Sequence, residues 1–377
     1  MSARRRTSTR PTRTRRPARR GEFDLIRALA ARLPQGSGVL LGPGDDAALL
    51  APRPGRELCA TTDAFVIGVH VPASTPPRAI GRRLAAANLS DLAAMAAAPR
   101  WALLSLGLSE ERDDVWVLEL ERGLGEALAE HGAAVVGGNV SRTPGADWMS
   151  VTLLGDVERG RAWTRYGARP GDRIAITGHP GRAGAAIHTG ALAFDEPLAT
   201  TFRPLRAAFL EPASRIELAG ALSAAGAVVA AIDLSDGVSS DLAHLCEASG
   251  IGAVIDETAW PDDPVLAEAA RLLLFQEIAG GGWQRASTRR ASFRPAHRAL
   301  ARTLRALRLG ASDDYELLLV VDPDAVESAR GVAAAHGVSL TFIGTCTDAP
   351  GVLVLEDSDG RTSAIEPAGW DHRGRQR

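Results

Sequence analysis

Short runs rich in β-forming residues alternate with longer runs of helical periodicity over most of the chain. In the first half, Ala79–Ala98, which Pro99 is expected to end, and Val115–His131 have helical spacing, and Trp101–Leu106 between them has the composition of a strand. Val135 and Val136 are predicted to form a buried strand that ends at Gly137-Gly138. In the second half, strands are predicted at Arg173–Thr177, Val228–Ile232 and Ala253–Ile255, the last two on either side of another helix. Strands that alternate with helices in both halves predict an α/β fold made of two domains.

The chain has 377 residues, which is enough for two domains of ordinary size. The segment Gly155–Gly171 is rich in Arg and Gly and lacks a long apolar run, which makes it the best boundary. We therefore expect an N-terminal domain over residues 21–158 and a larger C-terminal α/β domain over residues 159–377. Residues 280–309 begin with glycines and arginines and are interpreted as an irregular insertion.

The first twenty residues differ in composition from the rest of the chain. They contain about nine arginines and no acid, so that the remaining body carries a net charge of roughly −11. With almost nothing apolar to bury, this Arg-rich head (residues 1–20) is predicted to be disordered. It lacks the apolar core of a signal peptide, and no later run is long enough to span a membrane. A solvated tail is the favoured interpretation, and contact with RNA or an anionic surface is the alternative.

All 43 basic residues counted as Lys and Arg are arginine. A chain without lysine cannot contain a Walker A loop, a protein-kinase strand lysine or a Schiff base. Any phosphate bound here must therefore be held by arginine, backbone N–H groups or a metal ion. Cys59, Cys246 and Cys346 are far apart in the sequence, so neither a CxxC zinc motif nor a disulfide framework is indicated, and the cytoplasm is the expected compartment.

Five short polar motifs fall at the ends of predicted elements or in glycine loops. They are Gly44-Asp45-Asp46, Thr61-Thr62-Asp63, Asn88-Leu89-Ser90-Asp91, Gly137-Gly138-Asn139 and Asp233-Leu234-Ser235-Asp236-Gly237. A single such motif is often only a helix cap or an Asx turn. Together they form a set of oxygen ligands without sulfur, which favours Mg²⁺ or Mn²⁺ over zinc. Carboxylates brought together would also repel one another unless a cation lay between them.

The order of these motifs resembles a known family. The resemblance rests on the five motifs together with Gly21-Glu22-Phe23-Asp24-Leu25-Ile26, Asn88-Leu89-Ser90-Asp91-Leu92-Ala93-Ala94-Met95 and Asp314-Tyr315-Glu316-Leu317. These segments are similar to those of thiamine-monophosphate kinase, a family in the ATP-binding superfamily of aminoimidazole ribonucleotide synthetase and selenophosphate synthetase. The resemblance implies a two-domain aminoimidazole ribonucleotide synthetase-like fold and ATP-dependent phosphorylation of thiamine monophosphate to thiamine diphosphate, by direct in-line transfer.

The resemblance also implies a role for individual residues. Several Mg²⁺ ions would be held by Asp46, Thr61, Thr62, Asp63, Asp91, Asn139, Asp233 and Asp236. ATP would contact Gly138, Asn139, Arg165 and Ser235, and the substrate would contact His70, Asp313 and Trp370. No residue is expected to act as a catalytic base, because the attacking group is a phosphate oxygen that is already largely ionised. Two N-terminal domains would pair their sheets into a barrel across a homodimer.

Two positions depart from the family pattern. Asn139 stands where many members have aspartate, and Asp313 stands where the family has glutamate. These departures leave two rivals open: a related small-molecule kinase or synthetase with another substrate, and a non-catalytic nucleotide-binding regulator. A nucleic-acid-binding module driven by the arginine head is a third alternative, which predicts salt-sensitive binding.

Overall fold

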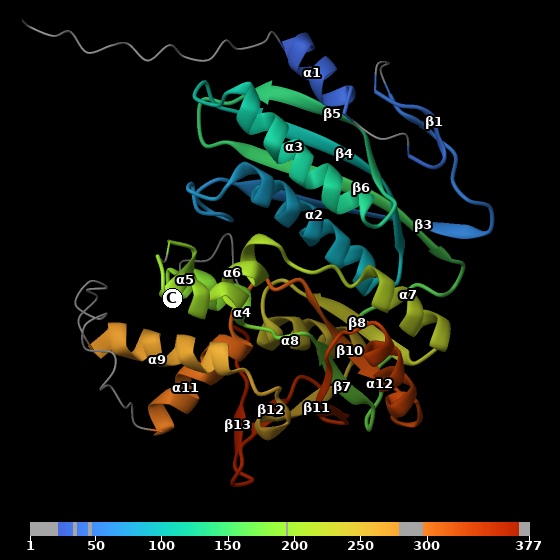
Figure 1. Ribbon diagram of the computed structural model, residues 1–377. Helices are drawn as coiled ribbons and strands as arrows, with labels where there is room; N and C mark the ends of the chain where they lie inside the picture. Colours follow the sequence, from blue (N-terminus) through green and yellow to red (C-terminus); the bar gives the residue numbers. More distant parts are fainter. Residues whose placement is uncertain (1–21, 33–35, 44–46, 194, 279–296, 369–377) are drawn as a thin grey trace, which may run out of the picture.

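The first half of the chain folds around a four-stranded sheet (Figure 1). The computed structural model describes residues 22–32, 36–43, 47–193, 195–278 and 297–368. The strand order in this sheet is β3 (Arg56–Val66), β6 (Trp148–Glu158), β4 (Ala98–Leu108) and β5 (Ala134–Arg142). The β4–β5 pair is parallel and the other two pairs are antiparallel. Both edge strands, β3 and β5, carry residues of the polar motifs.

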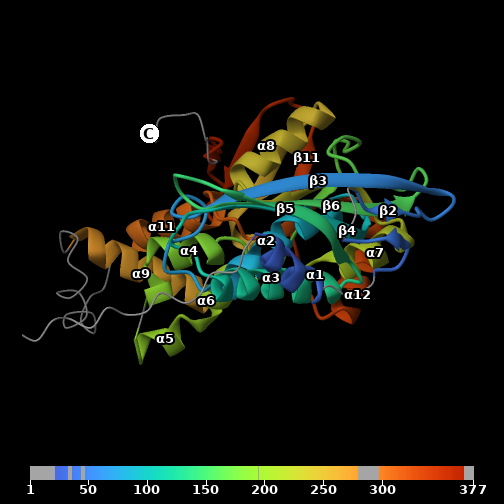
Figure 2. The ribbon, with the colours of Figure 1, turned by 90° about the horizontal axis from the view of Figure 1, so that it is seen from above.

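Two helices cover one face of this sheet. Helix α2 (Pro77–Ala94) and helix α3 (Asp114–Ala129) pack closely against each other (Figure 2). Glycines allow this approach, because a Cβ atom on Gly81 would lie 2.0 Å from the Leu120 carbonyl oxygen, and one on Gly123 would lie 2.0 Å from a carbonyl oxygen of α2. Helix α1 (Glu22–Ala30) and the hairpin of β1 (Val39–Leu41) and β2 (Leu49–Leu50) complete this half.

The second half contains a seven-stranded sheet. Its order is β13 (Thr362–Ala364), β12 (Leu353–Glu356), β9 (Gly252–Asp256), β11 (Leu340–Thr347), β7 (Arg173–Thr177), β10 (Glu316–Val321) and β8 (Val228–Leu234). All neighbours are antiparallel except β9 and β12. Alternate residues of β7, β8 and β10 enter two separate cores, one with helix α8 (Val238–Ser249) and one with helices α7 (Ile216–Ala225) and α12 (Val326–Ala335). These helices therefore lie on opposite faces of the sheet.

A group of helices joins the two halves. It consists of α4 (Arg182–His188), α5 (Leu198–Thr201), α6 (Arg203–Leu210), α9 (Pro264–Ile278) and α11 (His297–Leu309). Apolar side chains of α4, α6 and α9 belong to the same hydrophobic core as those of α2, α3 and the first sheet. Helix α2 also contacts α7, β8 and β10 directly, so the interface between the halves is packed rather than open.

The predicted α/β class with two sheet-containing halves is confirmed, and two local predictions were wrong. Helix α2 ends at Ala94 instead of continuing to Ala98, because Ala96 has a φ of +52° and the Ala97 N–H bonds back to the Leu92 carbonyl. Strand β5 continues through its two glycines instead of stopping there. A Cβ on Gly138 would lie 1.9 Å from the Leu104 carbonyl oxygen, so glycine is what allows the strand to pass.

Some predictions concern residues outside the described ranges. The arginine head, Asp45, Asp46 and Trp370 are among them, as is most of the predicted insertion. The described end of that insertion, residues 297–309, is helix α11. No helix in the described part of the chain is both long and apolar enough to cross a membrane.

Candidate active site between the two domains

Acidic side chains from three different elements converge at the junction of the domains. Asp63 lies on β3 and Asp91 lies near the end of α2. The pKa of Asp63 is raised to about 7, chiefly by burial and then by the negative charges of Asp91 and Asp313. Burial also raises the pKa of Asp91, although the Thr61 hydroxyl, which donates to its Oδ2 atom, acts in the opposite direction. The carboxyl groups of Asp63 and Asp91 therefore face each other in a region that is largely shielded from solvent.

The C-terminal domain contributes Asp233 to the same cluster. Asp233 is at the end of β8 and is only 5% exposed. Burial raises its pKa well above the ordinary value for aspartate, and the charges of Asp91 and Asp241 add to that effect. The structure thus brings together residues that are about 170 positions apart in the sequence. We call Asp63, Asp91 and Asp233 the acidic cluster.

The loop after β8 is held by a helix that follows it. The Asp236 N–H donates to Asp241 Oδ2 at 3.2 Å, and burial raises the pKa of Asp241 to about 7. Gly237 has a φ of +100°, and a Cβ there would lie 2.1 Å from the Gly310 carbonyl oxygen. The positive charge of Arg165 offsets part of the rise in the pKa values of Asp91 and Asp241, which places this arginine beside the cluster. Arg165, Asp236 and Asp233 therefore surround one region.

The predicted ligands on the first sheet are divided between its two faces. Side chains alternate along a strand, so Thr61 and Asp63 face α2 whereas Thr62 faces the opposite side. Thr62 Oγ1 donates to the Val151 carbonyl at 3.1 Å and lies 3.3 Å from Thr152 Oγ1 on that side.

Asn139 shares the face of Thr62. It is on edge strand β5, where its Nδ2 donates to Ser141 Oγ at 2.8 Å. In the register of the sheet, Asn139 lies opposite Ser105, and Ser105 lies opposite Ser150. Because β6 and β4 lie between β3 and β5, three interstrand spacings, about 14 Å, separate the strand of Thr62 from that of Asn139. The structure therefore does not bring Thr62 and Asn139 into the acidic cluster, and their ligand roles stay predictions.

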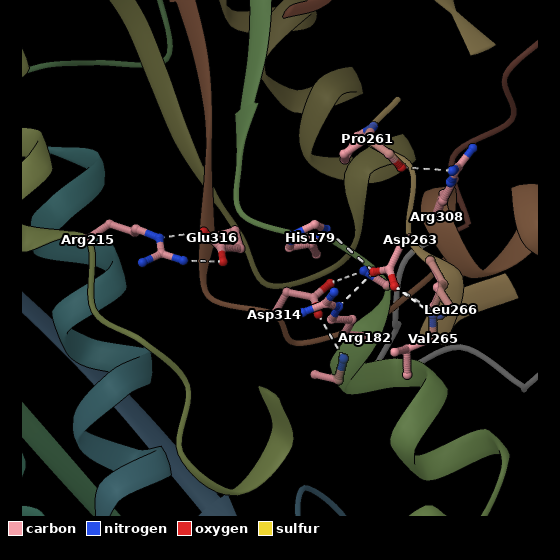
Figure 3. A network of polar contacts seen from close by, with 12 residues as sticks. His179, Arg182, Arg215, Pro261, Asp263, Val265, Leu266, Arg308, Asp314 and Glu316 are labelled. Carbon is pink, nitrogen blue, oxygen red and sulfur yellow. Dashed lines mark hydrogen bonds and ion pairs between the residues drawn. The ribbon is translucent and has the colours of Figure 1, made fainter. Parts of the chain in front are cut away.

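The segment Asp313–Glu316 is a centre of polar contacts (Figure 3). Asp314 is buried and accepts hydrogen bonds from the N–H groups of Gly181 and Ala183 at the start of α4, the second at 2.9 Å. Glu316 forms a nearly buried ion pair with Arg215, with 2.6 Å between Arg215 Nε and Glu316 Oε2. Figure 3 shows Asp314 and Glu316 directed to different partners from the same short segment. Their contacts fix the backbone on which Asp313 sits.

His70 lies in the turn that follows β3. Its Nδ1 atom accepts a hydrogen bond from the Val66 N–H at 3.0 Å, and its ring stacks on Phe65 with 5.7 Å between centroids. An Nδ1 atom that accepts puts the proton of the neutral ring on Nε2. The ring is therefore held in one orientation, and contact with a substrate stays a prediction.

A cavity of 590 Å³ lies beside edge strand β5. Its wall includes α1, the β1–β2 hairpin and residues of β4 and β5, among them Gly138 and Asn139. Most of the wall is apolar, and its volume is within the usual range for small-molecule sites. Glu121 of α3 also lines it, and burial raises the pKa of this side chain. The predicted ATP contacts Gly138 and Asn139 are thus in the wall of a cavity of suitable size.

Among the described residues, no three His, Cys, Asp or Glu side chains are arranged closely enough to hold a metal ion by themselves. The donor atoms of the acidic cluster and of Thr61 are nevertheless all oxygen, the type preferred by Mg²⁺. The raised pKa values show that these carboxylates are costly to ionise together. The donor set therefore fits a hard divalent cation that has further ligands from a bound phosphate.

Sequence analysis missed Arg83, a fully buried arginine beside the site. In the sequence, Arg82-Arg83 looks like an exposed charged pair on a helix. The signal was available in the helical phase, since Arg83 falls on the same face as Ile80, Leu84 and Ala87, which are all buried. An arginine on the apolar face of a helix needs hydrogen-bond partners inside the protein. The partners of Arg83 are the Phe209 carbonyl and the Asp313 carboxylate, both in the second half of the chain.

Comparison with known proteins agrees with this architecture. The model of the AIR synthase related protein, N-terminal domain, matches residues 44–157, and that of the AIR synthase related protein, C-terminal domain, matches residues 169–355. The two matched ranges contain the four-stranded and most of the seven-stranded sheet. The fold and the matches define the class of AIR synthase related proteins.

Individual relatives narrow the class. The thiamine-monophosphate kinase of Synechococcus elongatus is 40% identical over 337 residues, which cover 87% of this chain and 90% of that protein. The crystal structure of thiamine-monophosphate kinase from Stenotrophomonas maltophilia K279a has a TM-score of 0.72 and 32% identity, and covers 90% of this chain and 96% of its own. The solved structure of AaThiL complexed with AMPPCP and TMP has a TM-score of 0.67 and 26% sequence identity to this chain. The match covers 93% of this chain and 97% of the AaThiL chain. The chain belongs to the thiamine-monophosphate kinase family.

Proposed function

We propose that this chain transfers the terminal phosphoryl group of ATP to thiamine monophosphate, giving thiamine diphosphate and ADP. The observation that carries the proposal is the convergence of Asp63, Asp91 and Asp233 from both domains at one junction. The relatives named thiamine-monophosphate kinase and the AaThiL structure with AMPPCP and TMP support the identity of the two substrates.

The proposed reaction asks little covalent chemistry of the protein. The acceptor is a phosphate oxygen, which is largely ionised at neutral pH and can attack without a strong general base. Transfer then depends on holding donor and acceptor in line and on neutralising the charge of the transferring oxygens. Arg165 is suited to the second task, because it is a permanent positive charge beside the cluster.

Mg²⁺ is the cation proposed for the acidic cluster. Asp63, Asp91, Asp233 and the Thr61 hydroxyl would hold it, and Asp46, Thr62, Asn139 and Asp236 remain proposed ligands from the family resemblance. When bound, the cation would offset the negative charge on the transferring phosphate oxygens.

The substrates are assigned to two sides of the cluster. The adenine ring of ATP is proposed to enter the apolar cavity beside β5, with Gly138 and Asn139 in its wall and with Arg165 and Ser235 toward the phosphates. Thiamine monophosphate carries a cationic thiazolium ring, for which an acidic environment is favourable. Asp313, His70 and Trp370 are its proposed contacts, and the half-exposed side chain of Asp313 leaves room for such a contact.

A homodimer is proposed on the basis of the open face of the first sheet. This face carries Leu58 and Leu103, which are 55% and 38% exposed, among small side chains. Pairing of two such faces would bury this surface and would place Thr62 and Asn139 inside the assembly. Leu103→Asp is expected to shift the protein from dimer to monomer in sedimentation velocity, and an unchanged mass would contradict this pairing. We also propose the cytoplasm as the compartment, in agreement with three cysteines that are free thiols.

The proposed activity has a direct test. Purified protein is mixed with ATP, Mg²⁺ and thiamine monophosphate, and thiamine diphosphate and ADP are measured by chromatography. Equal amounts of both products are expected. Binding of ATP without product would favour a nucleotide-binding regulator, and product formed only from another phosphorylated acceptor would favour a related kinase.

A further inference from the structure

Arg83 is the most deeply buried charged side chain at the domain junction that the described residues contain. It extends from α2 of the first domain into the second and is 0% exposed. Its guanidinium group lies over the ring of Phe209, 3.9 Å from the centroid, and 5.0 Å from that of Tyr315. Nη1 donates to the Phe209 carbonyl at 2.8 Å. A buried charge is tolerated only with such partners.

The remaining contacts of Arg83 go to Asp313. Nη2 donates to Asp313 Oδ2 at 3.1 Å and is 3.3 Å from the Asp313 carbonyl oxygen. The Asp313 side chain is 51% exposed, so Arg83 holds one side of the carboxylate while the rest of the group is accessible. The charge of Asp313 also raises the pKa of Asp63, which shows that the accessible carboxylate is close to the acidic cluster.

Asp313 sits on a backbone that ordinary residues rarely adopt. Asp313 and Tyr315 have φ values of +48° and +55°. Such a conformation costs free energy in a residue other than glycine and persists only where its surroundings enforce it. The Asp313 N–H donates to the Ser235 carbonyl at 3.1 Å and the Tyr315 N–H to the Leu234 carbonyl at 2.9 Å. Arg83 adds the contact that ties this loop to the helix carrying Asp91.

We propose that Arg83 is a positioning residue that sets the affinity for the acceptor substrate by holding the Asp313 carboxylate beside the acidic cluster; this rests on the proposed function. Arginine is required because its planar group donates in two directions at once, to Phe209 and to Asp313, while stacking on an aromatic ring. Lysine at this position would keep the charge and lose that geometry. The ligand concerned is the cationic, phosphate-bearing acceptor and not the nucleotide.

The test compares Arg83→Lys, Asp313→Asn and the double variant with the unchanged protein. Steady-state kinetics give kcat and separate KM values for thiamine monophosphate and ATP, and calorimetry gives the acceptor Kd. Each single variant is expected to raise the acceptor KM and Kd by about 10-fold, the effect of one charge-assisted hydrogen bond. The ATP KM should stay within about twofold. The double variant should be little worse than either single one, because each substitution disrupts the same charge-assisted contact.

Arg82→Lys is the matched control, since the neighbouring Arg82 points the other way and pairs with Glu130 at 3.0 Å. It should leave both KM values unchanged. Equal effects of Arg83→Lys on both substrates, or additive effects in the double variant, would overturn the proposal. Because the Asp313 side chain is half exposed, the Asp313→Asn protein is expected to fold even if the Arg83→Lys protein does not. A normal acceptor Kd in the Asp313→Asn protein would refute the proposal.

The readouts also separate this proposal from the proposed function. Acceptor that binds to the unchanged protein without being phosphorylated would refute the kinase activity, while the Kd values still decide the role of Arg83. Acceptor that neither binds nor reacts would refute both.

Discussion

Replacing Asp63 by Asn is expected to stabilise the metal-free protein. Asp63 has a pKa of about 7 in the folded chain against 3.8 for an unperturbed aspartate, because it is buried and faces Asp91 and Asp313. A carboxyl group whose pKa is raised on folding favours the folded state below about pH 4 and loses that advantage as the pH rises to about 7. At pH 7.5 ionised Asp63 therefore costs up to about 4 kcal/mol, from roughly three pKa units at 1.36 kcal/mol each.

Asp63→Asn removes this cost. In EDTA at pH 7.5, we expect its free energy of unfolding to exceed that of the unchanged protein by about 2 to 4 kcal/mol, and by about 1 kcal/mol at pH 5. For a chain of this size, the difference at pH 7.5 corresponds to a rise in Tm of roughly 2–5 °C. Thermal unfolding followed by circular dichroism measures it at both pH values.

The same substitution should abolish the response to Mg²⁺ and ATP. Together they are expected to raise the Tm of the unchanged protein by stabilising the folded state through binding, and to have little effect on the variant. Asp195→Asn, at an exposed aspartate away from the cluster, should behave like the unchanged protein throughout. A metal-free Asp63→Asn protein that melts at or below the unchanged protein at pH 7.5 would refute the crowding of carboxylates on which the site is built.

Four other substitutions test other parts of the structure. Asp91→Asn should lower turnover by about 100-fold or more while the circular dichroism spectrum stays the same, because it removes charge next to the transferring group; near-normal kcat would contradict the assignment. Gly123→Ala should lower the free energy of unfolding in urea by about 2 kcal/mol, since its Cβ would meet a carbonyl oxygen of α2 at 2.0 Å. Gly220→Ala, in a helix with open space around it, should instead raise it by about 0.5–1 kcal/mol. Glu316→Gln should cost about 3 kcal/mol in thermal unfolding by leaving Arg215 without its buried partner, and a change under 1 kcal/mol would mean that the pair is dispensable.

The sequence predicted the elements better than the directions of their side chains. Strand β7 falls on its predicted residues, Arg173–Thr177, because a short apolar run between polar turns has few alternatives. The motif Thr61-Thr62-Asp63 was interpreted as one ligand group, although consecutive residues of a strand must point to opposite faces. Only the structure shows which of them meets Asp91, since that depends on the face that α2 covers.

Long-range pairing explains the other differences. The alternation of strands and helices left the pairing of the strands open, and among the described strands of the second sheet only β9 and β12 are parallel neighbours. Pro99 was expected to stop a helix and lies instead in β4, where the pairing with β6 is irregular between Pro99 and Trp101, so that the missing N–H is tolerated. Each of these facts depends on a neighbour that is distant in the sequence, and local patterns carry no information about it.

The shared core of the two halves limits how the chain can be divided. Phe202, between α5 and α6, and Leu205 and Phe209 of α6 are 0–2% exposed within the same cluster as Leu84 and Leu120 of the first domain. A fragment that ends with β6 would expose those contacts to water and would be prone to aggregation. Chimeras between relatives would therefore need α4 and α6 to be inherited with the first sheet, and calorimetry of the whole chain should record a single melting transition rather than two.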